Sequence, residues 1–458
     1  MSVAAMFREA LPAERLLVGD AIAEDYGHDE TLSATAHRPE AVLLPETTHE
    51  VAAVLEVADR ERIPLTPRGA GSGLSGGAIP HHGGVVVSFE RMGRILEIDT
   101  DNGVAVVEPG VRLSELDEAL APHGLVYPVR PGEESATLGG TIATNAAGMR
   151  AVRYGVTRNH VLGLELVLAG GEVVRTGGKV VKVSSGYDLT QLVIGSEGTL
   201  ALVTRIWLRL SRRPANTRTV LAPFARLSEV TAAIPPILAA GLDPLILEYI
   251  DLVTMAGILQ RAGIDLGVPE QVRSSALAYL VVQLDDDREV RVEEDTLALG
   301  QLLADELGAM DVYVLPGESA ARLVAAREQA FYNAKEAGFH DLIDVVVPRA
   351  ALPEYVHRVG EIARQHESLV VGCGHAGDGN VHMSVHQADP QVRERVMGAL
   401  LAAGIELGGA ISGEHGIGRH KRPWFLEMTD PVSLRLMRGI KDTFDPRGIL
   451  NPGAILEP

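Results

Sequence analysis

Apolar positions recur at helical spacing in several stretches of the chain and gather into short runs in others. In the stretch 45–60, four apolar residues between Val51 and Ala58 fall on one side of a helix. Thr47 or Thr48 can cap the helix at its beginning. The pattern therefore predicts a helix over 45–60. The same spacing predicts helices over 113–122 and 431–444.

Short apolar runs bounded by glycine, proline and polar residues predict strands. They cover residues 63–67, 85–89, 104–109, 162–168, 173–175, 201–210, 245–250, 277–283 and 344–348. The pair 162–168 and 173–175 is predicted to form a hairpin around Gly170 and Gly171. After Arg212-Arg213-Pro214, helices and short strands alternate as far as residue 410, which predicts an α+β domain.

Length and composition limit the class of protein. A chain of 458 residues is expected to form two or three domains. Its 41 basic and 61 acidic residues give a net charge of −20, which argues against nucleic acid and against an anionic membrane surface. The single cysteine excludes an internal disulfide and an iron–sulfur cluster held by this chain alone.

Membrane and export signals are lacking in the sequence. The first residues show no charged-then-apolar signal pattern, and no run reaches the roughly 18 apolar residues of a spanning helix. We therefore expect a cytoplasmic protein, with peripheral attachment at the inner face of the membrane as the alternative.

A glycine-rich loop follows the strand predicted over 63–67. Residues 69–77 contain five glycines, and Gly71, Gly73 and Gly76 spell a G-x-G-x-x-G pattern. The next predicted element is the strand 85–89, so the strand–loop–helix context of a Rossmann fingerprint is absent. The loop can instead turn backbone N–H groups towards an anion, or it is a flexible surface loop.

Two more segments are rich in small residues. The segment 137–148 would let a flat ligand approach the backbone closely, or would form a packed turn and short helix. The segment 186–200 precedes the strand predicted over 201–210.

The stretch 370–383 carries the clearest chemical signal. Asp378-Gly379 favours a two-residue type I′ hairpin turn. A turn centred there places His375 directly opposite His382, with Cβ atoms about 5 Å apart on one face. Two imidazoles placed in this way can share one divalent ion, although histidines in a hairpin also serve simply in packing.

Glu414 is a third candidate ligand. It lies in the stretch 412–418 and would complete a set of two histidines and one carboxylate with open positions for substrate. Zinc, manganese and iron are all compatible with such a set. Cys373 lies on the same face as His375 and is a weaker candidate.

Several motifs in order resemble a known group of flavoproteins. Segments 67–77, 137–148 and 186–200 resemble the FAD-binding domain of the vanillyl-alcohol-oxidase/p-cresol-methylhydroxylase superfamily. Segments 375–382, 414–418 and 450–453 resemble its FAD-linked 2-hydroxyacid dehydrogenases. That family includes the glycolate oxidase flavin subunit, D-lactate dehydrogenase and D-2-hydroxyglutarate dehydrogenase. The resemblance runs from about residue 36 to the end of the chain.

The resemblance implies an α+β fold with a two-subdomain FAD-binding domain, a cap domain and a C-terminal segment that returns to the flavin. The implied divisions are an N-terminal segment over 1–35, the FAD-binding domain over 36–213, the cap over 214–410 and the C-terminal segment over 411–458. Asn451 is expected to approach the isoalloxazine. The implied FAD-binding residues are Pro67, Arg68, Gly69, Gly71, Ser72, Gly73, Leu74, Ser75, Gly76, Pro131, Thr137, Gly139, Gly140, Thr144, Gly148, Glu197, Gly198 and Asn451.

The implied reaction oxidises a 2-hydroxy acid to a 2-oxo acid, with hydride transfer to flavin N5. A metal on His375, His382 and Glu414 would lower the pKa of the substrate hydroxyl. His415 is the implied general base, since a histidine suits that role near neutral pH, and its alternative is a supporting residue.

Substrate contacts follow from the same resemblance. Arg327 matches the arginine that holds the substrate carboxylate, although it could equally be a solvated helix residue. His382 and Ser384 are expected to contact the substrate as well, and Arg349 is a weaker candidate for the carboxylate.

Departures from the family pattern narrow the range of substrates that we expect. Leu342 and Phe331 stand where 2-hydroxyglutarate enzymes tend to carry a lysine and a polar residue. We therefore expect glycolate, D-lactate or a bulkier monocarboxylate. The segment 67–77 contains no histidine, and His81 and His82 lie beyond it, so we expect non-covalent FAD.

Two other functions compete with this interpretation. One is a flavoprotein transferase of the alkylglycerone-phosphate synthase type, and the other is a colourless metal hydrolase built on the His375/His382 hairpin. A dehydrogenase would need a separate electron acceptor: a quinone, a cytochrome, an electron-transfer flavoprotein or an iron–sulfur subunit. A homodimer is compatible with the resemblance.

Overall fold

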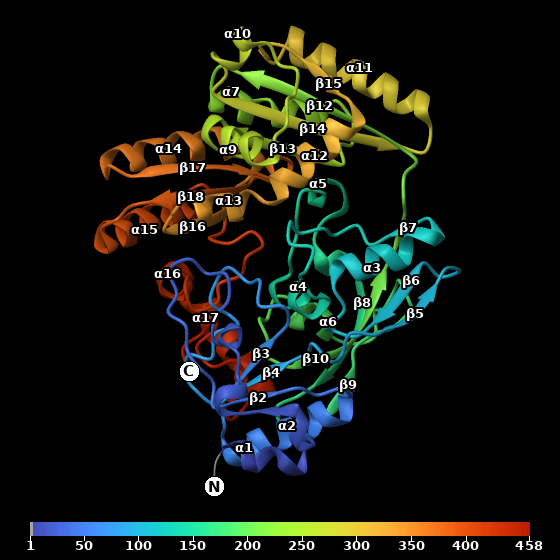
Figure 1. Cartoon of the computed structure of the whole chain (residues 1–458), viewed down its shortest axis with the longest axis vertical. Helices are drawn as coiled ribbons and strands as arrows, with labels where there is room; N and C mark the ends of the chain where they lie inside the picture. Colours follow the sequence, from blue (N-terminus) through green and yellow to red (C-terminus); the bar gives the residue numbers. More distant parts are fainter. Residues whose placement is uncertain (1–2) are drawn as a thin grey trace.

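The computed structural model describes residues 3–458, so residues 1 and 2 of the predicted N-terminal segment 1–35 lie outside the described part. The three larger sheets succeed one another along the long axis of the molecule (Figure 1), and a fourth sheet contains only two short strands, Leu125–Val126 and Ser211–Arg212. A small sheet with α2 lies at one end, a five-stranded sheet lies in the middle, and a seven-stranded sheet with its helices forms the other end. The mixed fold predicted from the sequence is confirmed.

The first sheet contains the parallel crossover that precedes the glycine-rich loop. Its order is β1 (Leu16–Leu17), β2 (Ala41–Leu43), β4 (Val85–Ser88) and β3 (Leu65–Arg68). Strands β2 and β3 both run parallel to β4, and α2 (Thr48–Glu61) connects them. Helix α2 was predicted to begin at residue 45 and begins at Thr48. The reason is that Thr47 is extended and caps the helix, since its side chain accepts a hydrogen bond from Glu50 N.

The second sheet is antiparallel. Its strands in order are β5 (Ile95–Asp99), β6 (Val104–Val107), β10 (Leu202–Arg209), β8 (Val161–Val167) and β9 (Val173–Arg175). Helices α3 (Leu113–Leu120) and α4 (Leu138–Thr144) bury their apolar residues in its core, and α6 (Leu189–Val193) follows. The two sheets together make the two-subdomain FAD-binding architecture.

The cap is built on the seven-stranded antiparallel sheet. Its strands in spatial order are β15 (Tyr313–Leu315), β12 (Asn216–Phe224), β14 (Ala278–Asp286), β13 (Ile246–Asp251), β17 (Leu369–Gly374), β18 (Asn380–His386) and β16 (Asp341–Val346). The main helices are α9 (Leu252–Ala262), α11 (Glu289–Asp305), α12 (Gly317–Glu328), α13 (Ala330–Glu336), α14 (Leu352–Gln365) and α15 (Pro390–Glu406).

The C-terminal segment returns to the first sheet. Helices α16 (Arg422–Met428) and α17 (Pro431–Phe444) precede a tail that lies beside β3. Leu65 N donates to Ile449 O at 2.8 Å, and Asn451 N donates to Leu65 O at 2.7 Å. Figure 1 shows this red segment among the blue strands of the chain's beginning. Within residues 3–458, no helix is both long enough and apolar enough to cross a membrane.

The predicted type I′ hairpin is wrong in its register. Strand β17 ends at Gly374 and β18 begins at Asn380, and His382 pairs with Cys373 instead of His375. Residues Ala376–Asp378 form one turn of 3₁₀ helix, so the connection is longer than two residues. Of the two expected turn residues only Gly379 has a positive φ, +77°. The pairing is shifted by two positions, and a shift of two keeps each side chain on its original face.

Candidate active site

One cavity of about 420 Å³ lies where the two FAD-binding sheets, the cap and the C-terminal segment meet. It is lined by nearly all the residues expected to bind FAD, and also by the residues expected to carry the chemistry. The latter are Arg327, His375, His382, Ser384, Glu414 and His415. The structure therefore brings together segments that are more than 300 residues apart in the chain.

Glycines make the cavity wall out of backbone. A Cβ on Gly69 would overlap the Thr137 hydroxyl, and a Cβ on Gly198 would overlap the Pro67 ring. Gly198 also has a φ of +69°, a conformation that other residues avoid. The three loops thus pack against each other with no room for side chains. A flat, extended cofactor fits such a wall because backbone N–H groups and small residues can approach it closely.

Glu197 and Asn451 join the loops behind this wall. The Glu197 carboxylate accepts hydrogen bonds from Ile417 N and Gly418 N, both at 2.8 Å. Asn451 Nδ2 donates to Glu197 O at 2.8 Å and to Gly77 O at 3.0 Å. Burial raises the pKa of Glu197 to about 7 despite these donors. These contacts fix the C-terminal segment against the cofactor loops.

Two residues expected to bind FAD do not line the cavity. Gly76 is nearest to Arg419 and His420, and its φ of +74° serves the turn. Gly148 has a φ of +125° and lies against the carbonyl of Arg130. Both glycines are required by backbone geometry next to the cavity. Arg349, the weaker carboxylate candidate, does not line the cavity either.

The three candidate metal ligands converge on one point. His375 Nε2 and His382 Nε2 lie 3.1 and 3.0 Å from Glu414 Oε1. One ligand atom from each of the three residues lies within 4.8 Å of the others. The histidines come from the two ends of the β17–β18 connection, and Glu414 comes from the segment after α15. The convergence was expected, although the hairpin that was to produce it has a different register.

The donor set fits a divalent cation. Burial opposes a charge on His375, but Glu248 and Glu414 outweigh it and raise the pKa of His375 to about 10. His382 Nε2 has Glu414 Oε1 3.0 Å away as its ion-pair neighbour, but it makes no well-aligned hydrogen bond to any described residue. Carboxylates therefore favour positive charge at this point, and an imidazole nitrogen is free to coordinate. His375, His382 and Glu414 would hold zinc, manganese or iron.

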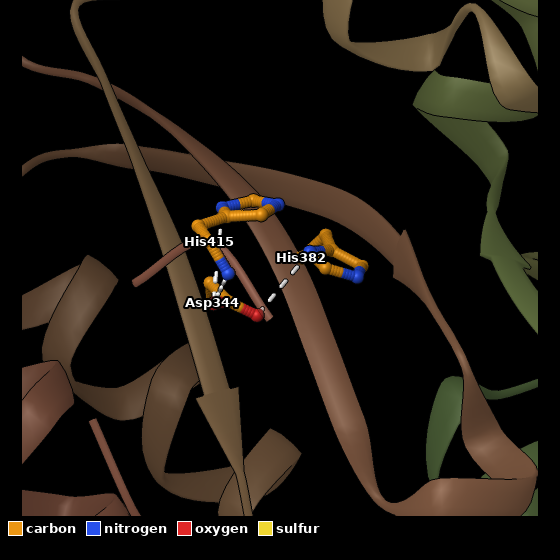
Figure 2. A group of neighbouring side chains, drawn as sticks. All are labelled: Asp344, His382 and His415. Carbon is orange, nitrogen blue, oxygen red and sulfur yellow. Dashed lines mark hydrogen bonds and ion pairs between the residues drawn. The ribbon is translucent and has the colours of Figure 1, made fainter. Parts of the chain in front are cut away.

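Asp344 organises the other side of the cluster, as Figure 2 shows. It is fully buried on β16, and its Oδ2 accepts hydrogen bonds from the Ser412 hydroxyl and from the backbone N–H groups of residues 413–415 at 2.7–3.0 Å. The same carboxylate lies 3.7 Å from His382 Nδ1 and 3.9 Å from His415 Nδ1. Asp344 thus fixes the loop that presents both Glu414 and His415.

His415 lies against His382 with parallel rings. The ring centroids are 4.9 Å apart at an interplanar angle of 27°. Burial lowers the pKa of His415 to about 4, even though Asp344 favours the charged form. At neutral pH His415 is therefore a neutral imidazole on the cavity wall, able to accept a proton.

Arg327 and Ser384 complete the cavity lining named from the sequence. Arg327 is buried at the end of α12, and its Nη2 lies 2.7 Å from Glu248 Oε2. Arg327 Nε has no hydrogen-bond partner among the described residues, so this cation keeps a donor for an anion. Ser384 lies two residues after His382 on β18, on the same face of the strand.

Sequence reasoning missed Glu248, Asp344 and Lys421. Each is almost fully buried, and Lys421 Nζ lies 3.8 Å from Asp344 Oδ2. The available signal was an acidic residue among the apolar residues of each strand, at Glu248 in 245–250 and at Asp344 in 341–346, where Asp341 is a second acid at the beginning of the strand. A charge in a buried strand requires a partner, and such a charge is therefore a sign of a site.

Two family models match the chain. The model described as the C-terminal domain of FAD linked oxidases matches residues 213–455, and the model described as a FAD binding domain matches residues 39–177. The chain belongs to the FAD-linked oxidase family. FAD is therefore its cofactor, and the hypothesis of a colourless metal hydrolase is wrong.

Curated relatives match this FAD-linked oxidase over nearly its whole length. An uncharacterized FAD-linked oxidoreductase of Mycobacterium tuberculosis is 52% identical, with 98% of each chain covered. A D-lactate dehydrogenase of Anaerostipes hadrus is 38% identical, with 98% of this chain and 96% of the relative covered. A glycolate oxidase subunit of Bacillus subtilis is 37% identical, with 93% and 91% covered.

The fold of this FAD-linked oxidase is also that of a solved flavoenzyme. A structure of p-cresol methylhydroxylase with substrate bound is similar, with a TM-score of 0.78 and 18% identity, covering 99% of this chain and 96% of that one. This similarity confirms the predicted p-cresol-methylhydroxylase-type fold.

The purified protein is expected to release its flavin on acid precipitation. The loop Pro67–Gly77 offers no histidine, and the histidines that line the cavity, His375, His382 and His415, lie at or beside the candidate metal site. The measurement is the visible absorbance of the supernatant and the pellet. Flavin that remains in the washed pellet would show a covalent link and contradict the expectation.

Proposed function

We propose that this FAD-linked oxidase is a dehydrogenase that oxidises a 2-hydroxy acid to the 2-oxo acid. The observation that carries the proposal is the shared cavity. Cofactor loops, a His-His-Glu set, a neutral imidazole and an arginine all line it. A 2-hydroxy acid needs each of them: a hydride acceptor, a Lewis acid, a base and a cation for its carboxylate.

The residues divide the work by position. Arg327 binds the substrate carboxylate, and His382 with Ser384 forms the wall beside the reacting carbon. His415 accepts the hydroxyl proton at Nε2, because its Nδ1 faces Asp344. When bound along the loops, FAD would supply the hydride acceptor, and a divalent ion held by His375, His382 and Glu414 would lower the pKa of the substrate hydroxyl. The buried setting excludes water from these charges.

The substrate we propose is a monocarboxylate, D-lactate or glycolate. Leu342 and Phe331 line the cavity together with Val371, so that part of the wall is apolar. A second carboxylate there would lose water without gaining a cation. The names of the relatives in Anaerostipes hadrus and Bacillus subtilis support this choice. The electrons would then pass to a separate acceptor, a quinone, cytochrome, electron-transfer flavoprotein or iron–sulfur subunit.

The direct test is an anaerobic visible spectrum before and after addition of each acid. We expect the yellow protein to be bleached by D-lactate or glycolate within the dead time of mixing or shortly after, and not by D-2-hydroxyglutarate. A yellow protein that none of the three acids bleaches would contradict the proposed substrate class. It would also revive the transferase alternative.

Leu342→Lys is expected to shift the substrate preference towards dicarboxylates. A cation at this apolar wall would pair with the second carboxylate of D-2-hydroxyglutarate. We expect the ratio of kcat/KM for D-2-hydroxyglutarate over D-lactate to rise about tenfold, which corresponds to about 1.4 kcal/mol. Leu342→Met, which keeps the wall apolar, is the control, and an equal ratio in both variants would refute the expectation.

A further inference from the structure

Glu248 contacts two residues that the proposed function places in different subsites. Its Oε1 lies 2.7 Å from His375 Nδ1, and its Oε2 lies 2.7 Å from Arg327 Nη2. The side chain is 1% exposed. A single buried carboxylate therefore connects a candidate metal ligand with the candidate cation for the substrate.

The fold holds this carboxylate firmly. Strand β13 is the central strand of the seven-stranded sheet, and it is paired with β14 on one side and β17 on the other. Tyr249 pairs with Gly374, which places Glu248 next to His375 where β17 ends. The position of the carboxylate is thus fixed by backbone pairing, and not only by the side chains that it contacts.

We propose that Glu248 is a positioning residue that sets the metal subsite and the anion subsite as one unit. His375 Nδ1–H donates to Glu248, which turns Nε2 towards Glu414 and the metal position. The second oxygen of Glu248 forms an ion pair with the guanidinium of Arg327 in the cavity wall. The distance between metal and anion position then depends on Glu248. This inference rests on the proposed function for the roles of the two subsites.

A simpler alternative is that Glu248 only neutralises the buried charge of Arg327. If that were the only role of Glu248, its substitution would leave metal binding unchanged. A joint role predicts that one substitution weakens both subsites, and this difference can be measured without turnover.

The first experiment compares Glu248→Gln with the wild-type protein, both loaded with FAD. Glutamine keeps the shape, but its amide cannot accept hydrogen bonds from both neighbours. We expect zinc affinity, measured by competition with a chelator, to fall 10–100-fold. We also expect the dissociation constant for oxalate, read from the flavin absorbance of metal-free protein, to rise about tenfold. Only the two changes together support the proposal. A change of less than twofold in either of them overturns it.

Asp251→Asn is the matched control. Asp251 is a half-buried carboxylate on the same strand that accepts hydrogen bonds from Thr254 N and Gly372 N and is not bonded to His375 or Arg327. We expect this variant to bind zinc and oxalate as the wild type does. An equal loss in the control would assign both effects to general loosening of β13 and overturn the proposal.

Arg327→Met tests the same connection from the other side, and it serves if Glu248→Gln does not fold. Arg327 also repels a cation directly, since its charge interacts with Glu414 in the same cavity, and loss of that repulsion alone would tighten zinc binding. A fall in zinc affinity can therefore arise only through the contact with Glu248. We expect zinc affinity to fall several-fold, and unchanged affinity overturns the proposal. If the wild type binds neither zinc nor oxalate, the proposed function fails together with the inference. If the wild type binds both zinc and oxalate and the variants bind them equally well, the inference fails and the proposed function stands.

Discussion

His415→Asn should lower kcat by about 10²–10⁴, the range typical of a lost general base, while FAD and metal stay bound. The reason lies in the geometry of the cluster. Asp344 Oδ2 accepts a hydrogen bond from the His415 backbone N–H at 2.8 Å, and the His415 ring stacks on His382 with its Nδ1 3.9 Å from the same carboxylate, which leaves Nε2 for the substrate. Asparagine keeps the backbone contact with Asp344 but cannot take the proton.

The measurement is single-turnover reduction of FAD by D-lactate or glycolate in a stopped-flow instrument. Zinc content should be unchanged, because the proposed ligands are His375, His382 and Glu414; a fall in zinc content would instead assign the ion to the neighbouring group of Asp344, His382 and His415. His357→Asn, at an exposed position on α14, controls for the loss of a histidine elsewhere. Reduction of the His415→Asn flavin at more than a tenth of the wild-type rate would show that another group removes the proton.

The sequence predicted the helices and strands around the site more reliably than the register in which the strands pair. Strands and helices followed from local patterns, and α17 begins and ends at the predicted residues, Pro431 and Phe444. The hairpin failed because Asp378-Gly379 has a local preference that tertiary contacts override. Gly379 packs against the Val347 carbonyl, and a Cβ there would overlap it. The connection therefore follows its neighbours in space, which a local pattern does not contain.

The site residues that could be predicted from the sequence are those that stand together in short local motifs. His375, His382, Glu414 and His415 stand in two short stretches with many glycines, and the structure brings all four to one cavity wall. Glu248 and Asp344 could not be assigned in the same way, because their partners come from other elements. Each is an acid among the apolar residues of a strand, and its role depends on which strands are neighbours. Gly76 and Gly148 show the reverse case: their motifs predicted contact with FAD, but both glycines are required for backbone turns beside the cavity.

Loss of the metal should have the second large effect. Glu414→Gln is expected to abolish stable zinc, manganese or iron binding, because Glu414 Oε1 lies close to the Nε2 atoms of both His375 and His382, at 3.1 and 3.0 Å. The amide can still accept the hydrogen bond from Ala147 N at 3.1 Å, so the fold should survive. We expect kcat/KM to fall about 10³-fold, which is about 4 kcal/mol of transition-state stabilisation.

Chelation of the wild type should reproduce this loss, and added metal should reverse it in the wild type but not in Glu414→Gln. The measurements are metal content and steady-state oxidation of D-lactate or glycolate with an artificial electron acceptor. Glu406→Gln removes an exposed acid that pairs with Arg358 and is the control. Wild-type protein stripped of all detectable metal that keeps its full rate would contradict this role. The oxidation would then depend on His415 and Arg327 without a metal. Glu414 would in that case serve only to orient His375 and His382.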